Sequence, residues 1–468
     1  MTRRHLLQGV GAALVSAISR SPVAFAAESA GPVMTRLSAY MSAAGSSTLP
    51  AEVIEKAKQH ILDTFAAMIS GADLPPGRAA IQFAREYGGQ RIATVAASNV
   101  LCGPIEAALA NGVMAHADET DDSWPSGWHP GCNVIPSALA VGEQAGITGM
   151  HFVRAVTLGY DVGARMLIAL SPGVFDTHKS THSIGGIFGS AAAAGSAAGL
   201  NAQQMRWLID YTAQQSSGIA AWSRDTDHIE KGFAFGGMPA RGGVTSALLV
   251  RSGWTGVEDV LSGEDNFLLA NEPHGDPNLL VEKLGERFEI VVTSIKKWSV
   301  GSPIQAPLDA MEILLKRRRV EPDQVREIVV RMDPRTSVVN NRDMPDICIQ
   351  HMLAIMLIDG TVTFRSAHDK PRMQDPAVLK QRAKVKLDPA AGQPLLTIVL
   401  ADGTRLSENV TAVLGTAGNP MTRDQVVAKS RELMTPVLGA STTAKLIDRI
   451  LGFENIKNVR ELRPLLQR

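Results

Sequence analysis

The stretch His116-Ala117-Asp118-Glu119-Thr120-Asp121-Asp122-Ser123-Trp124-Pro125-Ser126-Gly127-Trp128-His129-Pro130-Gly131 places four carboxylates between two histidines. It also holds two of the six tryptophans in the chain, and tryptophan rings favour burial. Carboxylates buried beside imidazoles have shifted pKa values, and such groups collect at functional sites. We therefore expect this stretch to form the centre of a functional site. The structural alternative is a helix end that runs into an acidic, capped loop carrying aromatic residues.

The helices that surround this stretch are predicted from hydrophobic periodicity. A helix that begins at Pro104 runs directly into His116, so the stretch starts at a helix end. Before it, a helix follows Pro50 and ends near Gly71, with its apolar residues on one stripe. Further helices are predicted over 135–145, 151–170, 184–198, 202–215 and 243–251. Alanine, glycine and serine dominate these segments, which favours close helix packing.

The character of the chain changes near residue 290. Strands are predicted over 325–332, 383–387, 395–400 and 405–410, the last two joined by an Asp402-Gly403 turn, with helices over 347–358 and 376–382. Helices return over 425–434 and 442–451, after a capping box at Thr422 and Gln425. We therefore predict a mainly α fold, with a large all-helical domain from both chain ends (30–290 and 415–468) and an inserted smaller α+β domain (291–414).

Composition limits the class of protein. The 468 residues are 45% hydrophobic and 20% charged, which predicts a folded chain of about two to three domains. Lys plus Arg equals Asp plus Glu at 46 each, so no net charge attracts nucleic acid or an anionic membrane. The basic run 316–319 is interpreted as the end of an amphipathic helix. Three distant cysteines form neither a disulfide framework nor a zinc ligand set.

The first 26 residues are predicted to be a twin-arginine signal peptide. Arg3 and Arg4 precede a mildly apolar segment, and Ala24-Phe25-Ala26 is an A-x-A cleavage site. This combination predicts export to the periplasm, and the alternative is an amphipathic amino-terminal helix. No later segment offers the roughly 18 uninterrupted apolar residues that a spanning helix requires, so we expect no membrane association after cleavage.

A second chemical stretch runs from His228 to Gly243. Lys231 and Arg241 flank an aromatic and glycine-rich segment that is predicted to be a turn leading into a helix at Gly243. Cationic donors and backbone N–H groups in this arrangement suit a carboxylate, and the same physics would suit a phosphate. The alternative is a tight loop with ordinary surface charges. No G-x-G-x-x-G motif and no P-loop is present, which argues against nucleotide binding.

Together these motifs resemble the MmgE/PrpD family, which includes 2-methylcitrate dehydratase, cis-aconitate decarboxylase and iminodisuccinate epimerase. The resemblance covers nearly the whole mature chain. It rests on six segments: 61–64, 116–130, 189–194, 231–243, 295–298 and 357–360. It implies a helical domain built from both chain ends, an inserted α+β domain, a homodimer, and a site between the domains that needs no metal or organic cofactor.

The family pattern D-x-D-D-T-W followed by H-P appears here with replacements. The resemblance places the site Asp and Thr of the family at Glu119 and Ser123, keeps its histidine as His129, and places its lysine at Lys231. A catalytic role for Asp122 is also predicted.

Two further family histidines are absent. One aligns with Ser180, where the neighbours His178 and His182 are candidate replacements, and the other falls on Gly301. We assign His182 to substrate binding, together with Asp121 and with Lys297 of the 295–298 segment. The two replacements put the known dehydration and decarboxylation substrates in doubt.

The expected chemistry is proton transfer next to a carboxylate of a small di- or tricarboxylic acid, as dehydration, decarboxylation or epimerisation. His129 is the candidate general base or acid, which Glu119, Asp121 or Asp122 would orient. Lys231 and Arg241 would stabilise developing negative charge, and Ser123 would hold a substrate oxygen.

Two other classes remain open. One is a metal-dependent hydrolase that uses His116, Asp118, Asp122 and His129. The other is a non-catalytic envelope protein that binds a small organic acid.

Overall fold

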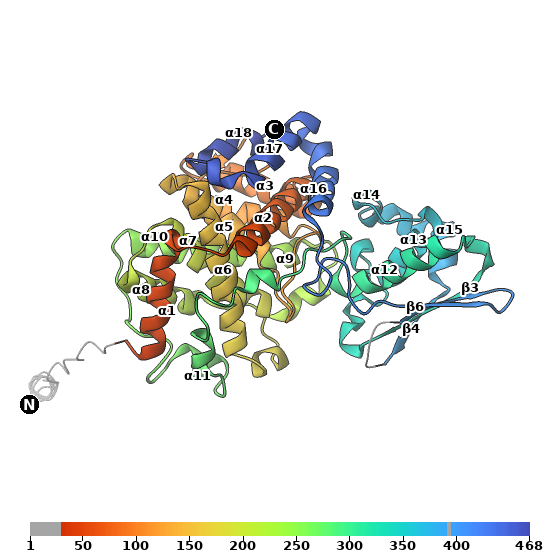
Figure 1. Cartoon of the computed structure of the whole chain (residues 1–468), viewed down its shortest axis with the longest axis horizontal. Helices are drawn as coiled ribbons and strands as arrows, with labels where there is room; N and C mark the ends of the chain where they lie inside the picture. Colours follow the sequence, from red (N-terminus) through yellow and green to blue (C-terminus); the bar gives the residue numbers. More distant parts are fainter. Residues whose placement is uncertain (1–29, 391–394) are drawn as a thin grey trace, which may run out of the picture.

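The computed structural model describes residues 30–390 and 395–468 as a larger helical body joined to a smaller α+β body (Figure 1). This confirms the predicted fold class. The predicted signal peptide lies outside the described residues. Among the residues that are described, no helix is both long and apolar enough to cross a bilayer. The three cysteines are buried and unpaired.

The larger body contains most of the helices. Their bounds are α1 Pro32–Ala43, α2 Ala51–Gly71, α3 Pro75–Tyr87, α4 Pro104–Ala115, α5 Gly131–Ala145, α6 Gly149–Ala169, α7 Thr181–Ala197, α8 Ala202–Gln215, α9 Ile229–Gly232, α10 Met238–Arg251, α11 Phe267–Asn271, α16 Arg423–Leu438, α17 Ala440–Leu451 and α18 Arg463–Leu466. A short hairpin of β1 (Ala93–Thr94) and β2 (Leu101–Cys102) completes it. Sequence periodicity did not predict α1, α3 or this hairpin.

Both ends of the described chain contribute to this body. Helix α16 packs against α2, and the buried Lys429 of α16 forms an ion pair of 2.6 Å with the buried Asp63 of α2. The same ammonium donates to the carbonyl of Thr120 at 3.0 Å. The C-terminal segment thereby supports the acidic stretch identified in the sequence.

The smaller body has a four-stranded sheet in the order β4-β3-β5-β6. The strands are β3 Val325–Met332, β4 Val385–Pro389, β5 Leu395–Leu400 and β6 Arg405–Asn409, and the helices are α12 Ser302–Arg317, α13 Ile349–Asp359, α14 Phe364–Ala367 and α15 Pro376–Arg382. Strand β3 pairs parallel with β4 and antiparallel with β5, and Asp402-Gly403 forms the predicted turn between β5 and β6, with Gly403 at φ +88°.

Two hydrophobic cores underlie the two bodies. The core of the larger body includes Ile295 and Met421, whereas the core of the smaller body begins at Trp298 and ends at Val410. The chain therefore crosses between the bodies at residues 296–297 and again at 411–420. The domain limits 291 and 414 stay a prediction.

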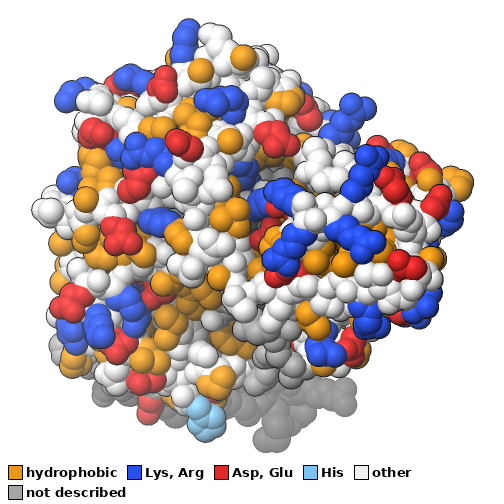
Figure 2. Space-filling view, turned by 45° about the vertical axis from the view of Figure 1, so that its right-hand side comes forward, with side chains coloured by type: hydrophobic (Ala, Val, Ile, Leu, Met, Phe, Trp, Pro, Cys, Tyr) orange, Lys and Arg blue, Asp and Glu red, His pale blue; other side chains and the backbone are white. Residues whose placement is uncertain are grey.

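The charged surface is mixed in sign. Lys and Arg side chains gather over the smaller body, interspersed with Asp and Glu (Figure 2). Within the basic run of α12, Lys316 pairs with Glu312 at 3.1 Å and Arg317 pairs with Glu408 at 2.5 Å. These local ion pairs agree with the interpretation of the run as a helix end.

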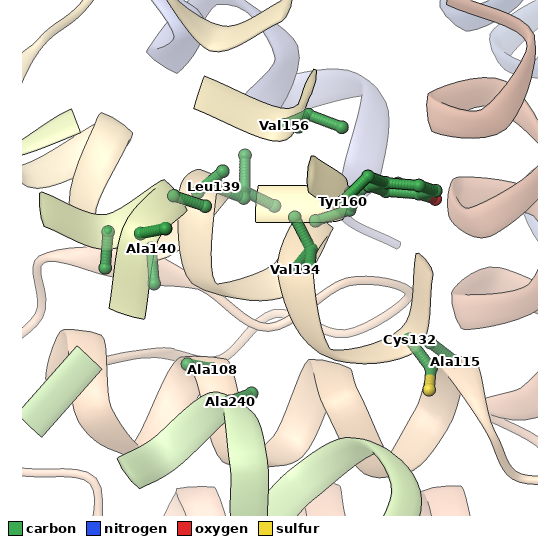
Figure 3. Packing of buried hydrophobic residues seen from close by; sticks show 14 of the residues in the cluster. Ala108, Ala115, Cys132, Val134, Leu139, Ala140, Val156, Tyr160 and Ala240 are labelled. Atoms are coloured by element: carbon green, nitrogen blue, oxygen red, sulfur yellow. The ribbon is translucent and has the colours of Figure 1, made fainter. Parts of the chain in front are cut away.

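Small side chains bring the central helices of the larger body close together. Ala108 of α4, Ala140 of α5 and Ala240 of α10 lie in the packed interior between these helices (Figure 3). Gly236 allows the closest approach, because a Cβ at this position would collide with the carbonyl group of Gly112 in α4.

That packing corrects one prediction. Residues 232–243 do not form a glycine-rich turn, because α9 continues through a π-helical turn, η4 (Phe233–Gly237), into α10. The glycines serve helix contact, so their N–H groups do not form an open anion cradle. The segment still presents Lys231 and Phe235 to the site described below.

Candidate active site

A cavity of about 410 Å³ lies between the two bodies. The larger body contributes the loop between α4 and α5, the start of α7, the 3₁₀ helix η3 (Ala220–Arg224), α9 and η4. The smaller body contributes residues near 302, 338 and 347. The lining residues are Glu119, Ser123, Trp124, Pro125, Gly127, His129, His182, Trp222, Ser223, Lys231, Phe235, Gly301, Ser302, Pro303, Val338, Val339, Arg342 and Ile347.

His129 is oriented by the carboxylate of Asp121, which contacts the ring on the side away from the cavity. Its Nδ1 lies 3.1 Å from Oδ1 of Asp121, which is fully buried. Burial would raise the pKa of Asp121, but His116 and His129 lower it well below the usual range. An ionised carboxylate only accepts hydrogen bonds, so Nδ1 of His129 carries the hydrogen. Nε2 of the neutral ring is then left with its lone pair, as a general base requires.

His116 shares the same carboxylate. Its Nδ1 lies 3.0 Å from both oxygens of Asp121. Burial lowers the pKa of His116 to about 4, against the opposing effect of Asp121. His116 is therefore a neutral donor near pH 7, and it fixes Asp121 in turn.

Lys231 and Glu119 form a buried ion pair at the cavity wall. Lys296 approaches the same carboxylate at 3.4 Å and donates to the Glu119 carbonyl at 2.8 Å. Burial would raise the pKa of Glu119, but Lys231 and Lys296 lower it well below its usual range. His228 Nε2 lies 3.4 Å from Oε1 of Glu119. The backbone of His228 has a positive φ of +68°. Such left-handed backbone is uncommon outside glycine and often marks a functional site.

An aromatic wall adjoins these charges. His182, from the first turn of α7, stacks on Phe235 with ring centroids 3.6 Å apart, and Trp222 meets the same phenylalanine edge-on at 4.6 Å. The ammonium of Lys231 lies 5.2 Å from the Phe235 ring centroid. Burial of its ring lowers the pKa of His182 well below the usual range, so His182 is a neutral group of the wall. Ser180, the N-cap of α7, does not line the cavity.

Five of the nine residues predicted from sequence line this cavity. They are His129, Lys231, Glu119, Ser123 and His182. Asp121 contacts His129 from behind the cavity wall, and Ser123 lies 3.4 Å from Ser302 of the smaller body through their hydroxyl oxygens.

Asp122, predicted to be catalytic, is directed away from the cavity. Its Oδ2 accepts from the Tyr160 hydroxyl at 2.6 Å and contacts Nδ1 of His60 at 2.7 Å. Its Oδ1 accepts from the N–H of Gly131 at the start of α5, at 2.8 Å. These bonds attach the acidic loop to α2, α5 and α6, so the structure gives Asp122 a structural position.

Two predicted substrate-binding cations also lie elsewhere. Arg241 is exposed on α10 and does not line the cavity, because the helix carries residue 241 away from the side that presents Lys231. Lys297 turns into the smaller body, where it pairs with Glu312 at 2.7 Å and lies 4.1 Å from the Trp298 ring centroid.

Sequence reasoning missed several lining residues. Trp222, Val339, Arg342 and Ile347 lie more than 90 residues after the acidic stretch and belong to no motif, so only the docking of the two bodies identifies them. Lys296 lies next to Lys297 in the 295–298 segment. The sequence does not show which of the two side chains reaches the site.

The four residues proposed for a metal do not converge. Asp118 contacts His368 of the smaller body at 3.0 Å, and Asp122 faces the helices described above. Other described donors, His116, Glu119 and His228, do approach one another. The ammonium groups of Lys231 and Lys296 neutralise Glu119, however, and would repel a divalent cation there.

Comparison with known proteins places this geometry in a family. Residues 35–279 match the MmgE/PrpD N-terminal domain, and residues 298–452 match the MmgE/PrpD C-terminal domain. The chain is 26% identical to cis-aconitate decarboxylase of Homo sapiens over 446 residues, which cover 89% of this chain and 90% of that protein. It is 23% identical to cis-aconitate decarboxylase of Aspergillus terreus over 460 residues, covering 89% and 92% respectively. Since the two domain matches together span most of its length, the chain belongs to the MmgE/PrpD family.

Proposed function

We propose that this protein is a lyase or isomerase that transfers a proton next to a carboxylate of a small di- or tricarboxylic acid, without a metal or organic cofactor. The observation that carries the proposal is the bond between His129 Nδ1 and the ionised Asp121, beside Lys231 in one cavity. Family membership and the cis-aconitate decarboxylase relatives support a lyase that acts on a small carboxylic acid.

In the proposed step, Nε2 of His129 takes the proton from the carbon next to the carboxylate. The C–H bond breaks, and its electron pair moves onto the carboxylate oxygens as an enediolate. Lys231 stabilises that charge in a site where apolar walls exclude water. Ser123, at the cavity wall, is placed to donate to a substrate oxygen.

The intermediate then follows one of two routes. Loss of a β-hydroxyl group, protonated by the imidazolium, gives an alkene, whereas return of the proton to the other face gives the epimer. Decarboxylation uses the same groups in another order: the C–C bond to the carboxylate breaks, CO₂ leaves, and His129 in its imidazolium form protonates the carbanion.

The test is incubation of the purified protein in deuterated water with di- and tricarboxylates, followed by NMR. We expect deuterium to enter a carbon next to a carboxylate, and we expect His129→Gln to abolish this entry. If no acid of the panel exchanges or turns over, yet binding survives His129→Ala and Lys231→Ala, the protein is an acid-binding protein and the enzymatic proposal fails.

Chelation tests the cofactor part of the proposal. Full activity after dialysis against a chelator is expected, because the described carboxylates of the site are already bonded to lysine or histidine. Loss of activity that zinc or manganese restores would favour the metal-dependent hydrolase.

Location and assembly are proposed on separate grounds. The twin-arginine pattern of residues 1–26 supports export to the periplasm, and family resemblance supports a homodimer. Fractionation of a tagged full-length chain and sedimentation analysis of the mature chain test these proposals.

A further inference from the structure

Arg342 is a cation in the cavity wall without an acidic partner. Among the described residues that line the cavity, the cations are Lys231 and Arg342. Lys231 is bonded to Glu119, whereas no described carboxylate lies within ion-pair distance of Arg342. A charge left unpaired in a partly enclosed wall is costly unless a ligand completes it.

Backbone carbonyls hold this guanidinium in place. Its Nη1 donates to the carbonyl of Ser223 at 2.7 Å, and its Nη2 donates to that of Asp225 at 3.1 Å. A longer contact of 3.5 Å joins Nη1 to the carbonyl of Val338 in the smaller body, to which Arg342 belongs. Ser223 and Asp225 come from the larger body, so the guanidinium bridges the two. Carbonyl acceptors orient a cation without neutralising its charge, and part of the five-donor fork stays available.

The rest of the cavity wall is largely apolar. Trp124, Trp222, Val339 and Ile347 line it beside Gly301. A Cβ built on Gly301 would lie 3.6 Å from Ile347 and Val339, so the wall at this glycine has room for one further methyl-sized group in ordinary van der Waals contact. A substrate carboxylate against this apolar part of the wall would lose its hydrating water and would gain no cationic partner.

We propose that Arg342 is the specificity-determining residue that holds the carboxylate of the substrate remote from the reacting carbon. Two cations then match a dicarboxylate, with the reacting end at Lys231 and the remote end at Arg342. An apolar substituent of that acid packs against the wall at Gly301, which has no side chain of its own to exclude it. A third carboxylate would face the apolar wall, so a tricarboxylate fits poorly. This inference rests on the proposed function for the role of Lys231, but its test is a binding measurement.

The test is calorimetry with glutarate and with its half-amide, in which one carboxylate is replaced by a neutral amide. In the parent protein we expect glutarate to bind more tightly than the half-amide, pentanoate or propane-1,2,3-tricarboxylate. Arg342→Gln should weaken glutarate binding about 10- to 100-fold, as expected for loss of a charge-assisted hydrogen bond. The same substitution should change half-amide binding by less than about 3-fold. Arg241→Gln, an exposed arginine outside the cavity, is the matched control and should leave both affinities unchanged.

A second variant tests the apolar part. Gly301→Ala adds a methyl group that fits in ordinary van der Waals contact, at an extended backbone of φ −50° and ψ 142° that any residue adopts. The substitution should weaken the binding of a propyl-substituted glutarate, and this loss of affinity should be at least 10-fold larger than the loss for glutarate itself.

The outcomes separate this inference from the proposed function. If Arg342→Gln weakened the binding of glutarate and of its half-amide equally, the assignment of Arg342 to the remote carboxylate would be wrong. It would also be wrong if the parent protein bound the tricarboxylate more tightly than glutarate. Selective loss of glutarate supports it, even if no acid exchanges deuterium and the enzymatic proposal fails. If the parent protein exchanges deuterium but Arg342→Gln binds glutarate as tightly as the parent, the enzymatic proposal stands. Only the role of Arg342 is then refuted.

Discussion

Asp121→Asn is the substitution that most directly tests how His129 is activated. The carboxylate of Asp121 contacts Nδ1 of His129 at 3.1 Å and Nδ1 of His116 at 3.0 Å from both of its oxygens. Loss of one charge-assisted hydrogen bond costs about 1.5 to 3 kcal/mol, or about 10- to 150-fold in rate. The amide of asparagine can also donate to Nδ1, which would place the hydrogen of His129 on Nε2 and remove the base. In the Ser-His-Asp triad the corresponding change costs about 10⁴-fold in kcat.

We therefore expect kcat for deuterium exchange or turnover to fall at least 100-fold in Asp121→Asn, with a smaller change in KM. Rates should be measured from pH 5 to 9, because Asp121→Asn removes the anionic partner of the proposed base. The pH profile of Asp121→Asn should therefore shift relative to that of the parent. Substrate binding measured by calorimetry should stay within about 3-fold of the parent value.

Asp122→Asn is the matched control for this experiment. Asp122 is equally buried and also contacts a histidine, but that histidine, His60, does not line the cavity. It should lower the free energy of unfolding by about 1 to 3 kcal/mol through its bonds to Tyr160 and Gly131, with an unshifted pH profile. If Asp121→Asn retains more than a third of the parent rate, or if both variants shift the profile equally, the assignment of Asp121 as the residue that positions His129 is refuted.

Three further predictions concern stability, measured by urea unfolding. Burial alone would lower the pKa of His368, but its carboxylate partner raises it from 6.5 to about 9; this stabilisation is complete below pH 6.5 and is lost as the pH rises through about 9. His368→Gln should therefore flatten the decline in stability between pH 7 and 9.5, and an unchanged slope would contradict the assignment. Gly236→Ala should destabilise by about 3 kcal/mol or more, because the added Cβ meets the Gly112 carbonyl; a neutral effect would show that the helices can separate. Lys429→Met should cost about 3 to 5 kcal/mol by leaving Asp63 buried without its cation, whereas a loss below about 1 kcal/mol would refute the importance of this pair.

The elements of the smaller body were well predicted, for a physical reason. Alternation along 325–332 and the Asp402-Gly403 turn are local signals, and β3 and the β5–β6 hairpin occur where they indicate. Apart from α1, α3 and the short helices α9, α11 and α18, the helices of the larger body were predicted to within about five residues for the same reason, since periodicity depends on near neighbours in sequence.

The segment 232–243 shows where local signals fail. Glycine and aromatic residues together are typical of a turn, but here Gly236 and Gly237 permit contact with α4 that larger residues would block. The tertiary gain from that contact outweighs the poor helix propensity of glycine, which costs about 1 kcal/mol per residue. No property of the segment itself reveals the partner helix.

The same limit explains why the sequence indicated Arg241, which does not line the cavity. Arg241 stands near Lys231 in the chain, and a turn between them would have directed both cations at one ligand. Because the segment is helical, the two side chains separate, and Arg241 is exposed to solvent. Arg342 lies 111 positions after Lys231 in a segment without any motif, yet the docking of the smaller body brings its guanidinium to the carbonyls of Ser223 and Asp225. The sequence predicted an arginine at the cavity, and which arginine lines it depends on how the two bodies meet. Substrate preference in this chain should accordingly follow the residues that the smaller body contributes to the cavity, while proton transfer should follow the acidic stretch of the larger one.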